Sequence, residues 1–412
     1  LYLRTLAPDV VDADGGEFQF AAWNFSFVHP TGYPLYLILG GIFQHLVPIG
    51  NPAYRLNVFT AMTAALAVGA VYLAAREITR QRAAAVIGAA SFALTRTFWY
   101  DASAAETYDL NAFFVAALIF IALRWQAKPR ALTFAAFCFV YGLALTHHRT
   151  IVLWIPAFAV FFLIVAWHAH ASRLASWNAA ASVPYFSLFA FAFLLPLLLY
   201  LYIPLRAPAS PYATLTLAPG HAIVLYDNSP RGFIDYVLGR VFQSEIGWDA
   251  QSAARLATIP QLVLDQFGAV GIALGVVGII AMVWRKEWAR LVLLAAGFAA
   301  TTLFAVLYHI GDIFHYYIPA YLVWGLWIGV GIFALVGLVN SRQSTFNSRW
   351  IAACCLLLAA CLIIPQWISN LPSADRSGET QKRAQWTHLL AASPENAILI
   401  SNDRDEMMPL WY

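Results

Sequence analysis

The feature that most constrains this chain is a series of apolar segments, each close to the length that crosses a lipid bilayer as a helix. About 20 apolar residues in a helix span the roughly 30 Å of hydrocarbon in a membrane. After a short apolar stretch at residues 1–8, such segments lie at 56–76, 83–99, 108–124, 131–147, 150–167, 181–202, 267–284, 290–308, 315–339 and 350–368. We therefore predict an all-α polytopic membrane protein of about eleven transmembrane helices, the first of them truncated.

The composition agrees with a membrane protein. Of 412 residues, 61% are hydrophobic and 11% are charged, whereas a soluble domain carries about 25% charged residues. Aromatic residues reach 15%, as expected for a protein with two aromatic belts at the membrane interfaces. The net charge of +3 comes mainly from Lys and Arg in short loops between helices, so we expect the lipid bilayer as a partner and no nucleic acid.

The basic loops predict the orientation of the helices. Every second loop is short and basic, and cytoplasmic loops of membrane proteins carry an excess of Lys and Arg. The residues concerned are Arg76, Arg80, Arg82, Arg124, Lys128, Arg130, Arg173, Arg285, Lys286, Arg290, Arg342 and Arg349. We expect these loops to be cytoplasmic and the opposite helix ends to be extracytoplasmic.

The domain organisation follows from this topology. Residues 1–368 are predicted to form one transmembrane catalytic module, with a first extracytoplasmic loop at 9–55 and a long one at 203–266. Residues 369–412 are expected to begin an extracytoplasmic C-terminal segment. The chain lacks an initiator Met and stops at Tyr412, so we expect it to be truncated at both ends.

Two apolar or amphipathic stretches on the outer side differ from the spans. Tyr33–Val47 is short and bracketed by prolines, which favours a re-entrant or interfacial helix. Ala254–Phe267 is amphipathic and is predicted to form a short helix along the membrane surface.

Asp14 and Glu17 are the first candidate catalytic residues. Gly15 and Gly16 allow a tight turn, after which Glu17 would open a helix that ends near Trp23. The two acids can point the same way if the helix begins early. They could act as a base and its orienting partner, or only as a helix cap and first-turn acids.

Four further polar or aromatic residues are candidates for substrate binding. His29 and Tyr33 lie in a Pro- and Gly-rich segment, where His29 could bind a phosphate or hydroxyl or simply hold a rigid loop. Glu106 and Tyr108 stand where a span begins, and Glu106 could equally be an acid favoured at a helix start.

The cationic candidates stand at outer helix ends. His147, His148 and Arg149 lie between two apolar segments, and Arg206 follows another span. Charged residues at membrane depth usually face a cavity or pair with an anion, and Arg grips phosphate well. The alternative is contact with lipid headgroups.

A last group joins two spans near the C-terminal third of the chain. His309, Asp312 and His315 are each three residues apart, and Tyr316 follows. One shared face is possible if the turn is helical. The geometry is too open to predict a metal site, and we expect Asp312 and Tyr316 to hydrogen bond to a sugar or acceptor.

Several motifs together resemble a GT-C-type family of membrane glycosyltransferases, the family whose eukaryotic members are protein O-mannosyltransferases. Two departures stand out. Gly15 occupies a position where the family often has Ser, and the tail reads Asn402-Asp403-Arg404-Asp405-Glu406 where the family often has Gly-Asp-Asn-Asp. The matching segments are Thr5–Pro8, Asp14–Phe18, His29–Tyr36, Gly50–Asn57, Glu106–Asn111, Leu145–His148, Pro204–Arg206, Asp312, Tyr317–Pro319 and Pro409–Tyr412.

The resemblance implies a polyprenyl-phosphate-linked sugar donor, with mannose the best guess, and a first-loop acid as catalytic base. We expect a single inverting displacement in which Asp14 takes the proton of an acceptor hydroxyl and Glu17 orients that hydroxyl. The phosphate would be held by His147, His148, Arg149 and Arg206. The acceptor could be protein, lipid or glycan.

No cofactor is indicated by the motifs, although a divalent metal is possible. We expect a bacterial inner membrane protein whose active site is extracytoplasmic. Two other classes remain open: a transporter or flippase of lipid-linked sugars, which should hold ionisable residues near the bilayer midplane in broken helices, and a non-catalytic assembly subunit.

Overall fold

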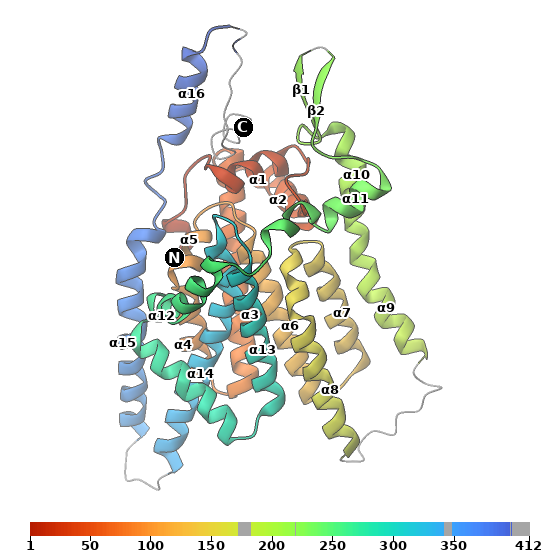
Figure 1. The fold of residues 1–412 in the computed structure, drawn as a ribbon. Helices are drawn as coiled ribbons and strands as arrows, with labels where there is room; N and C mark the ends of the chain where they lie inside the picture. Colours follow the sequence, from red (N-terminus) through yellow and green to blue (C-terminus); the bar gives the residue numbers. More distant parts are fainter. Residues whose placement is uncertain (172–182, 219, 342–347, 396, 398–412) are drawn as a thin grey trace.

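The computed structural model describes residues 1–171, 183–218, 220–341, 348–395 and 397, and shows a bundle of long helices with smaller elements gathered at one end (Figure 1). Arg173, Arg342 and the acids at 402–406 lie outside the described residues. The helices of the bundle are α3 (Pro52–Thr79), α4 (Arg82–Ala93), α6 (Tyr108–Ala127), α7 (Ala131–Leu145), α8 (Ile155–Ala171), α9 (Val183–Leu197), α12 (Ala250–Trp284), α13 (Trp288–Leu307), α14 (Ile318–Ser341) and α15 (Ser348–Ala374).

The smaller elements connect these helices. They are α1 (Ala13–Trp23), α2 (Pro34–Leu46), α5 (Arg96–Asp101), α10 (Tyr202–Arg206), α11 (Pro230–Val237) and α16 (Lys382–Ala392). The 3-10 helices are η1 (Tyr2–Arg4), η2 (Arg149–Trp154), η4 (Leu198–Leu201), η5 (Ala207–Ala209), η6 (Arg240–Glu245) and η7 (Ile313–Tyr317). The strands β1 (Thr214–Ala218) and β2 (His221–Val224) form an antiparallel hairpin inside the long loop, which the sequence analysis did not predict.

The predicted fold class is confirmed, with a different count of full-length spans. Within the described residues, 8 helices are long and apolar enough to cross a membrane, and α2, α4 and α7 are shorter apolar helices. The predicted segments 83–99 and 131–147 therefore fall on the short helices α4 and α7. Residues 1–8 contain only the single turn of η1, so the truncated first span is not seen.

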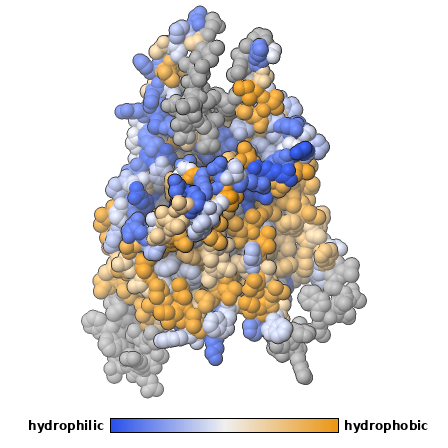
Figure 2. All heavy atoms as spheres, in the orientation of Figure 1, coloured by the Kyte–Doolittle hydropathy of each residue, from blue (hydrophilic) through white to orange (hydrophobic). Residues whose placement is uncertain are grey.

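The two ends of the bundle differ in charge and in composition. At the lower end in Figure 1, Arg80 and Arg285 line one shallow hollow, and Arg124 pairs with Glu77 at 3.5 Å. The upper end carries α1, α2, the β-hairpin and α16, and an extensively hydrophobic surface lies below it (Figure 2). The basic loops that the structure describes, at 76–82, 124–130 and 285–290, thus share one end, as the alternation along the sequence predicted.

Glycines set the closest helix crossings in the bundle. A Cβ on Gly278 of α12 would lie 2.0 Å from the Trp327 carbonyl oxygen of α14. A Cβ on Gly88 of α4 would lie 2.6 Å from the Gly325 carbonyl oxygen, also on α14. Since only glycine fits at such distances, these positions let backbones pack directly, as small residues do in membrane bundles.

Helix α12 is divided by a sharp kink. Gly268 has φ 64° and ψ 175°, a conformation that favours glycine. The part before the kink is largely exposed and runs across the bundle, whereas the part after it descends along α14 (Figure 1). The prediction of a separate amphipathic helix at Ala254–Phe267 agrees with this break.

The C-terminal segment returns to the first loop. Arg383 of α16 donates to both carboxylate oxygens of Asp9 at 2.6 Å, and Lys382 pairs with Asp12. The described part of residues 369–412 therefore contacts the same end of the molecule as residues 9–55.

Candidate active site

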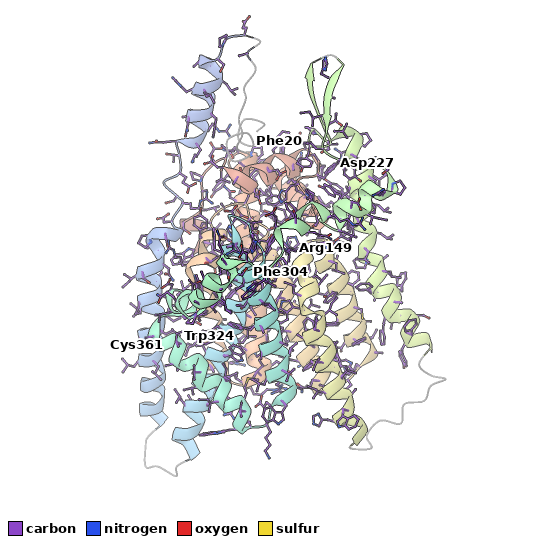
Figure 3. All side chains as sticks on the ribbon, viewed as in Figure 1. Phe20, Arg149, Asp227, Phe304, Trp324 and Cys361 are labelled. Carbon is purple, nitrogen blue, oxygen red and sulfur yellow. The ribbon has the colours of Figure 1, made fainter. Side chains whose placement is uncertain are left out.

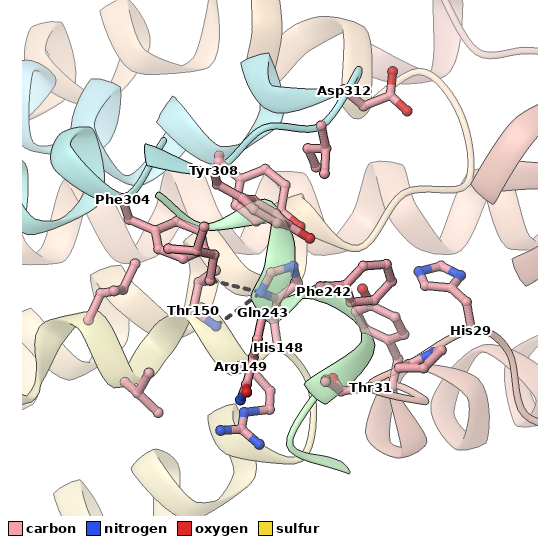
Figure 4. Close-up of a pocket in the computed structure, with 18 of the residues that line it drawn as sticks. His29, Thr31, His148, Arg149, Thr150, Phe242, Gln243, Phe304, Tyr308 and Asp312 are labelled. Carbon is pink, nitrogen blue, oxygen red and sulfur yellow. Dashed lines mark hydrogen bonds between the residues drawn. The ribbon is translucent and has the colours of Figure 1, made fainter. Parts of the chain in front are cut away.

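A cavity of about 410 Å³ lies at the upper end of the bundle and gathers most of the predicted site residues (Figure 4). Its walls come from the first loop, the start of α6, the α7–η2 junction, η6 and the α13–η7 turn. The lining residues are Asp14, His29, Pro30, Thr31, Tyr33, Tyr108, His148, Arg149, Thr150, Val152, Leu153, Leu238, Gly239, Phe242, Gln243, Ile246, Phe304, Tyr308, Ile310, Gly311, Asp312 and Tyr316. Figure 3 places Arg149 and Phe304 within the whole molecule.

Helix α1 brings the two predicted acids together. It begins at Ala13, so Asp14 and Glu17 both lie within its first turns, and residues three apart share a helix face. The prediction of a tight turn at Gly15 and Gly16 is wrong, because both glycines are buried within helix α1. A Cβ on Gly15 would lie 3.0 Å from the Ala105 carbonyl oxygen, so this glycine lets α1 pack closely against residues 102–107.

Glu17 and Asp14 have different surroundings despite their shared face. The Glu17 side chain is 3% exposed and does not line the cavity. One of its oxygens accepts from the His29 backbone N–H at 2.9 Å, and the other lies 2.5 Å from His29 Nδ1. Because a carboxylate only accepts hydrogen bonds, Nδ1 is the donor. His29 then presents Nε2 toward Asp14 Oδ2 at 3.8 Å.

The same three side chains bear on the question of a divalent metal. One ligand atom each from Asp14, Glu17 and His29 can be chosen so that all lie within 4.8 Å of one another. Carboxylate and imidazole suit several divalent ions. Both Glu17 oxygens accept a hydrogen bond from His29, and each keeps a second lone pair, so these contacts leave room for a bound ion.

The His147-His148-Arg149 segment divides between the core and the cavity. His147 is fully buried, and its Nε2 bonds the Thr107 carbonyl oxygen at 2.8 Å, away from the cavity lining. His148 and Arg149 do line the cavity. Burial, with a smaller contribution from the neighbouring His147 and His29, lowers the pKa of His148 to about 3, which favours the neutral ring.

Arg149 is the one Arg or Lys among the described residues that line the cavity. Its Nη1 donates to the Val237 carbonyl oxygen at 2.5 Å, which ties the α7–η2 junction to the end of α11. Burial of Leu153 and Trp154 against α13 fixes the same segment from the other side.

Arg206 lies elsewhere. Its Nε and Nη2 donate to the carbonyl oxygens of Phe25 and Asn24 at 2.5 and 3.0 Å, and it does not line the cavity. The structure therefore separates Arg206 from the other predicted phosphate ligands, because α10 ends beside the C-terminus of α1.

The predicted substrate-binding residues mostly meet in the cavity. His29, Tyr33, Tyr108, Asp312 and Tyr316 line it, whereas Glu106 does not. Burial is the main reason that the pKa of Glu106 is raised to about 8. The nearby His315 lowers this pKa, and the negative charges of Asp101 and Asp14 raise it further.

The expected shared face of His309, Asp312 and His315 is not formed. His309 Nε2 lies 3.2 Å from Ser252 Oγ, and His315 Nδ1 pairs with the buried Asp101 at 2.7 Å. Only Asp312 reaches the cavity. A 3-10 helix would align residues three apart, but η7 begins after Asp312, so His309 and Asp312 lie outside it.

Several lining residues were missed by the sequence analysis. Thr150 directly follows Arg149 and could have been noticed there. Phe242 and Gln243 come from η6 in the long loop, Gly239 directly precedes η6, and Tyr308 directly follows α13. Nothing in their local sequence distinguishes them, because η6 is brought over the cavity only by the folding of the loop.

Comparison with known proteins shows similarity to membrane glycosyltransferases in sequence and in fold. Residues 14–171, which contain α1, the His29–Tyr33 loop and the His147–Arg149 segment, match the family model described as the Protein O-mannosyl-transferase TMEM260 N-terminal domain. This match covers less than half of the 412-residue chain. The family resemblance drawn from the sequence is thereby confirmed.

Two relatives carry the same name. The chain is 31% identical to "Protein O-mannosyl-transferase TMEM260" of Mus musculus over 159 residues, covering 38% of this chain and 23% of the mouse protein. It is 23% identical to the TMEM260 protein of Dictyostelium discoideum over 385 residues, covering 83% of this chain and 44% of that protein. The chain thus spans less than half the length of either relative.

Solved structures extend the similarity of fold beyond the TMEM260 domain. ArnT from Cupriavidus metallidurans bound to undecaprenyl phosphate matches with a TM-score of 0.60 and 12% identity, over 99% of this chain and 82% of ArnT. The Archaeoglobus fulgidus oligosaccharyltransferase matches with a TM-score of 0.58 and 16% identity, over 99% of this chain and 57% of that protein. The fold is therefore that of the GT-C membrane glycosyltransferases.

Proposed function

We propose that this protein is a GT-C-type membrane glycosyltransferase that moves a sugar from a polyprenyl-phosphate-linked donor to an acceptor hydroxyl. Mannose is the sugar best supported, because both relatives are named protein O-mannosyl-transferases. The polyprenyl-phosphate donor is supported by the similarity in fold to an ArnT structure with bound undecaprenyl phosphate.

The observation that carries the proposal is a single cavity with a carboxylate on one side and N–H donors on another. Asp14 stands beside His29, while His148 and Arg149 line the same space. A glycosyl transfer needs both features, a base for the incoming hydroxyl and positive or hydrogen-bonding groups for the departing phosphate.

The proposed reaction is one displacement with inversion. Asp14 accepts the proton of the acceptor hydroxyl as its oxygen bonds to the anomeric carbon. The bond from that carbon to the phosphate oxygen breaks, and the electron pair leaves with the phosphate. The donor diester carries one negative charge and the released monoester gains a second, which Arg149 and the His148 N–H stabilise as it develops.

Glu17 acts through His29 in this proposal. Its carboxylate holds the ring with Nδ1 protonated, so that Nε2 faces Asp14. Tyr33, Tyr108, Asp312 and Tyr316 supply the hydroxyl and carboxylate groups that would bind sugar or acceptor.

The transfer assay uses purified protein with polyprenyl-phosphate sugars labelled in the sugar. We expect label to move into a hydroxyl-bearing acceptor from the mannose donor, and assays with and without EDTA show whether a divalent metal is needed. Labelled sugar carried across a proteoliposome membrane while still linked to lipid would instead support a flippase. The absence of both transfer and translocation would support an assembly subunit.

The active site is proposed to be extracytoplasmic, because the basic loops lie at the opposite end of the bundle. A cysteine at Gly220 in a Cys-free background should react with an impermeant thiol reagent added outside intact cells. A cysteine at Lys128 should be protected, and both positions are exposed in the fold. The reverse pattern would place the cavity on the cytoplasmic side.

A further inference from the structure

The side chain of His148 is held by contacts that fix which ring nitrogen carries its proton. The Thr150 backbone N–H donates to His148 Nδ1 at 3.3 Å. A backbone N–H can only donate, so Nδ1 must be the acceptor. A ring that accepts at Nδ1 is neutral and carries its proton on Nε2.

A second contact to Nδ1 involves the Thr150 hydroxyl. Thr150 Oγ1 lies 2.7 Å from His148 Nδ1 (dashed in Figure 4), and Asn111 Nδ2 donates to the same oxygen at 3.4 Å. With the amide of Asn111 donating to the oxygen, the hydroxyl proton is left to point toward the ring. Asn111, Thr150 and His148 thus form one chain of hydrogen bonds with a fixed direction.

The other ring nitrogen, Nε2, is buried in the wall of the cavity. His148 is 4% exposed and lines the cavity, and its Nε2 has no hydrogen-bond partner among the described residues. The rings of Tyr33, Tyr108 and Tyr316 surround the imidazole at 5.3–5.9 Å between centroids. A buried N–H without a partner is costly, so this nitrogen is suited to a ligand that accepts a hydrogen bond.

We propose that Thr150, supported by Asn111, fixes His148 as a neutral Nε2–H donor to a phosphate oxygen of the sugar donor, beside Arg149. Thr150 and Asn111 are positioning residues in this inference. The identity of the phosphate rests on the proposed function, whereas the tautomer of His148 does not. Arg149 supplies the positive charge, and His148 adds a directed hydrogen bond without a second charge.

The matched variants are Thr150→Val and Thr150→Ser. Valine has the shape of threonine without the hydroxyl, and serine keeps the hydroxyl. Affinity is measured with polyprenyl-phosphate mannose, a diester with no second phosphate ionisation near pH 7. We expect Thr150→Ser to bind within about twofold of wild type and Thr150→Val to lose about two- to twelvefold, the usual range for one net hydrogen bond.

Two further readouts separate positioning from general damage. Asn111→Ala should weaken binding, and combining it with Thr150→Val should cost little more than Thr150→Val alone, because both act on one chain of hydrogen bonds. In ¹⁵N-histidine spectra of the wild-type protein, assigned by loss of the His148 signals in His148→Asn, Nδ1 should be unprotonated and Nε2 protonated from pH 8 to pH 5.

Either of two results would overturn the inference: protonated Nδ1 in wild-type His148, or equal affinity and unchanged His148 signals in Thr150→Val and Thr150→Ser. If the tautomer is as described but neither wild type nor any variant binds the mannose donor, the positioning of His148 stands and the proposed function falls.

Discussion

The two functional walls of the cavity are built in opposite ways. The carboxylate wall (Asp14 and His29) comes from α1 and the loop after it. Glu17 is buried behind this wall and holds the His29 ring with Nε2 toward Asp14. The nitrogen wall (His148 and Arg149) comes from the α7–η2 junction and presents N–H groups. In the proposed reaction, the first wall would remove a proton and the second would stabilise negative charge.

The largest effect should follow from Asp14→Asn. The substitution keeps the size and hydrogen-bonding capacity of the side chain but removes the proton acceptor, so transfer should fall by roughly 10²- to 10⁴-fold. Steady-state turnover and donor affinity are measured together. Donor affinity and Tm should stay close to wild type, since Asp14 is not on the nitrogen wall.

Glu17→Gln sharpens the assignment at the carboxylate wall. It should reduce turnover less than Asp14→Asn, because Glu17 does not line the cavity and acts through His29. A larger loss at Glu17 than at Asp14 would exchange their roles. Near-normal turnover in both single variants and in the double variant would end the proposal of a first-loop base.

The nitrogen wall predicts a smaller effect of another kind. Arg149→Ala should weaken donor binding by about ten- to over a hundredfold through loss of a charge-assisted contact worth roughly 1.5–3 kcal/mol. Arg206→Ala is the matched control, because Arg206 bonds backbone carbonyls outside the cavity. Donor affinity measured by titration should separate the two, and equal losses would break the distinction between the walls.

The smallest effect concerns Glu106, which lies near Asp101 and Asp14 but does not line the cavity. Burial raises the pKa of Glu106 from its ordinary 4.5 to about 8. Between these values the folded protein keeps a proton that the unfolded chain has lost, so this group makes stability fall as pH rises from about 5 to 8.

Thermal unfolding at pH 5.5, 7 and 8.5 tests this consequence. The side chain in Glu106→Gln is neutral at every pH, so the Tm of the variant minus that of wild type should increase as pH rises. The other titrating groups are common to both proteins and cancel in this difference. A Tm difference that does not change with pH would show that Glu106 ionises at its ordinary pKa in the folded protein.

The sequence predicted the fold and the carboxylate wall better than the nitrogen wall. Apolar length and alternating basic loops are direct consequences of the bilayer, so the helices could be found. Asp14 and Glu17 lie close in the chain, and a single helix brings them together. The separate surroundings of His147 and His148, and the position of Arg206, depend on contacts between distant elements that local sequence does not reveal.

Glu17 shows the same limit on a smaller scale. Its sequence position indicated an acid beside Asp14, but only the fold of the His29–Tyr33 loop shows that its carboxylate is occupied by His29. Thr150 is a similar case, since its role depends on Asn111 from α6.

The anomeric configuration of the product tests the central claim most directly. The purified protein is given polyprenyl-phosphate mannose of known configuration, and the new glycosidic bond is analysed by NMR. A single displacement with Asp14 as base predicts inverted configuration, formed by wild type and nearly absent with Asp14→Asn. Retained configuration would contradict the account, because a single in-line displacement inverts the anomeric carbon.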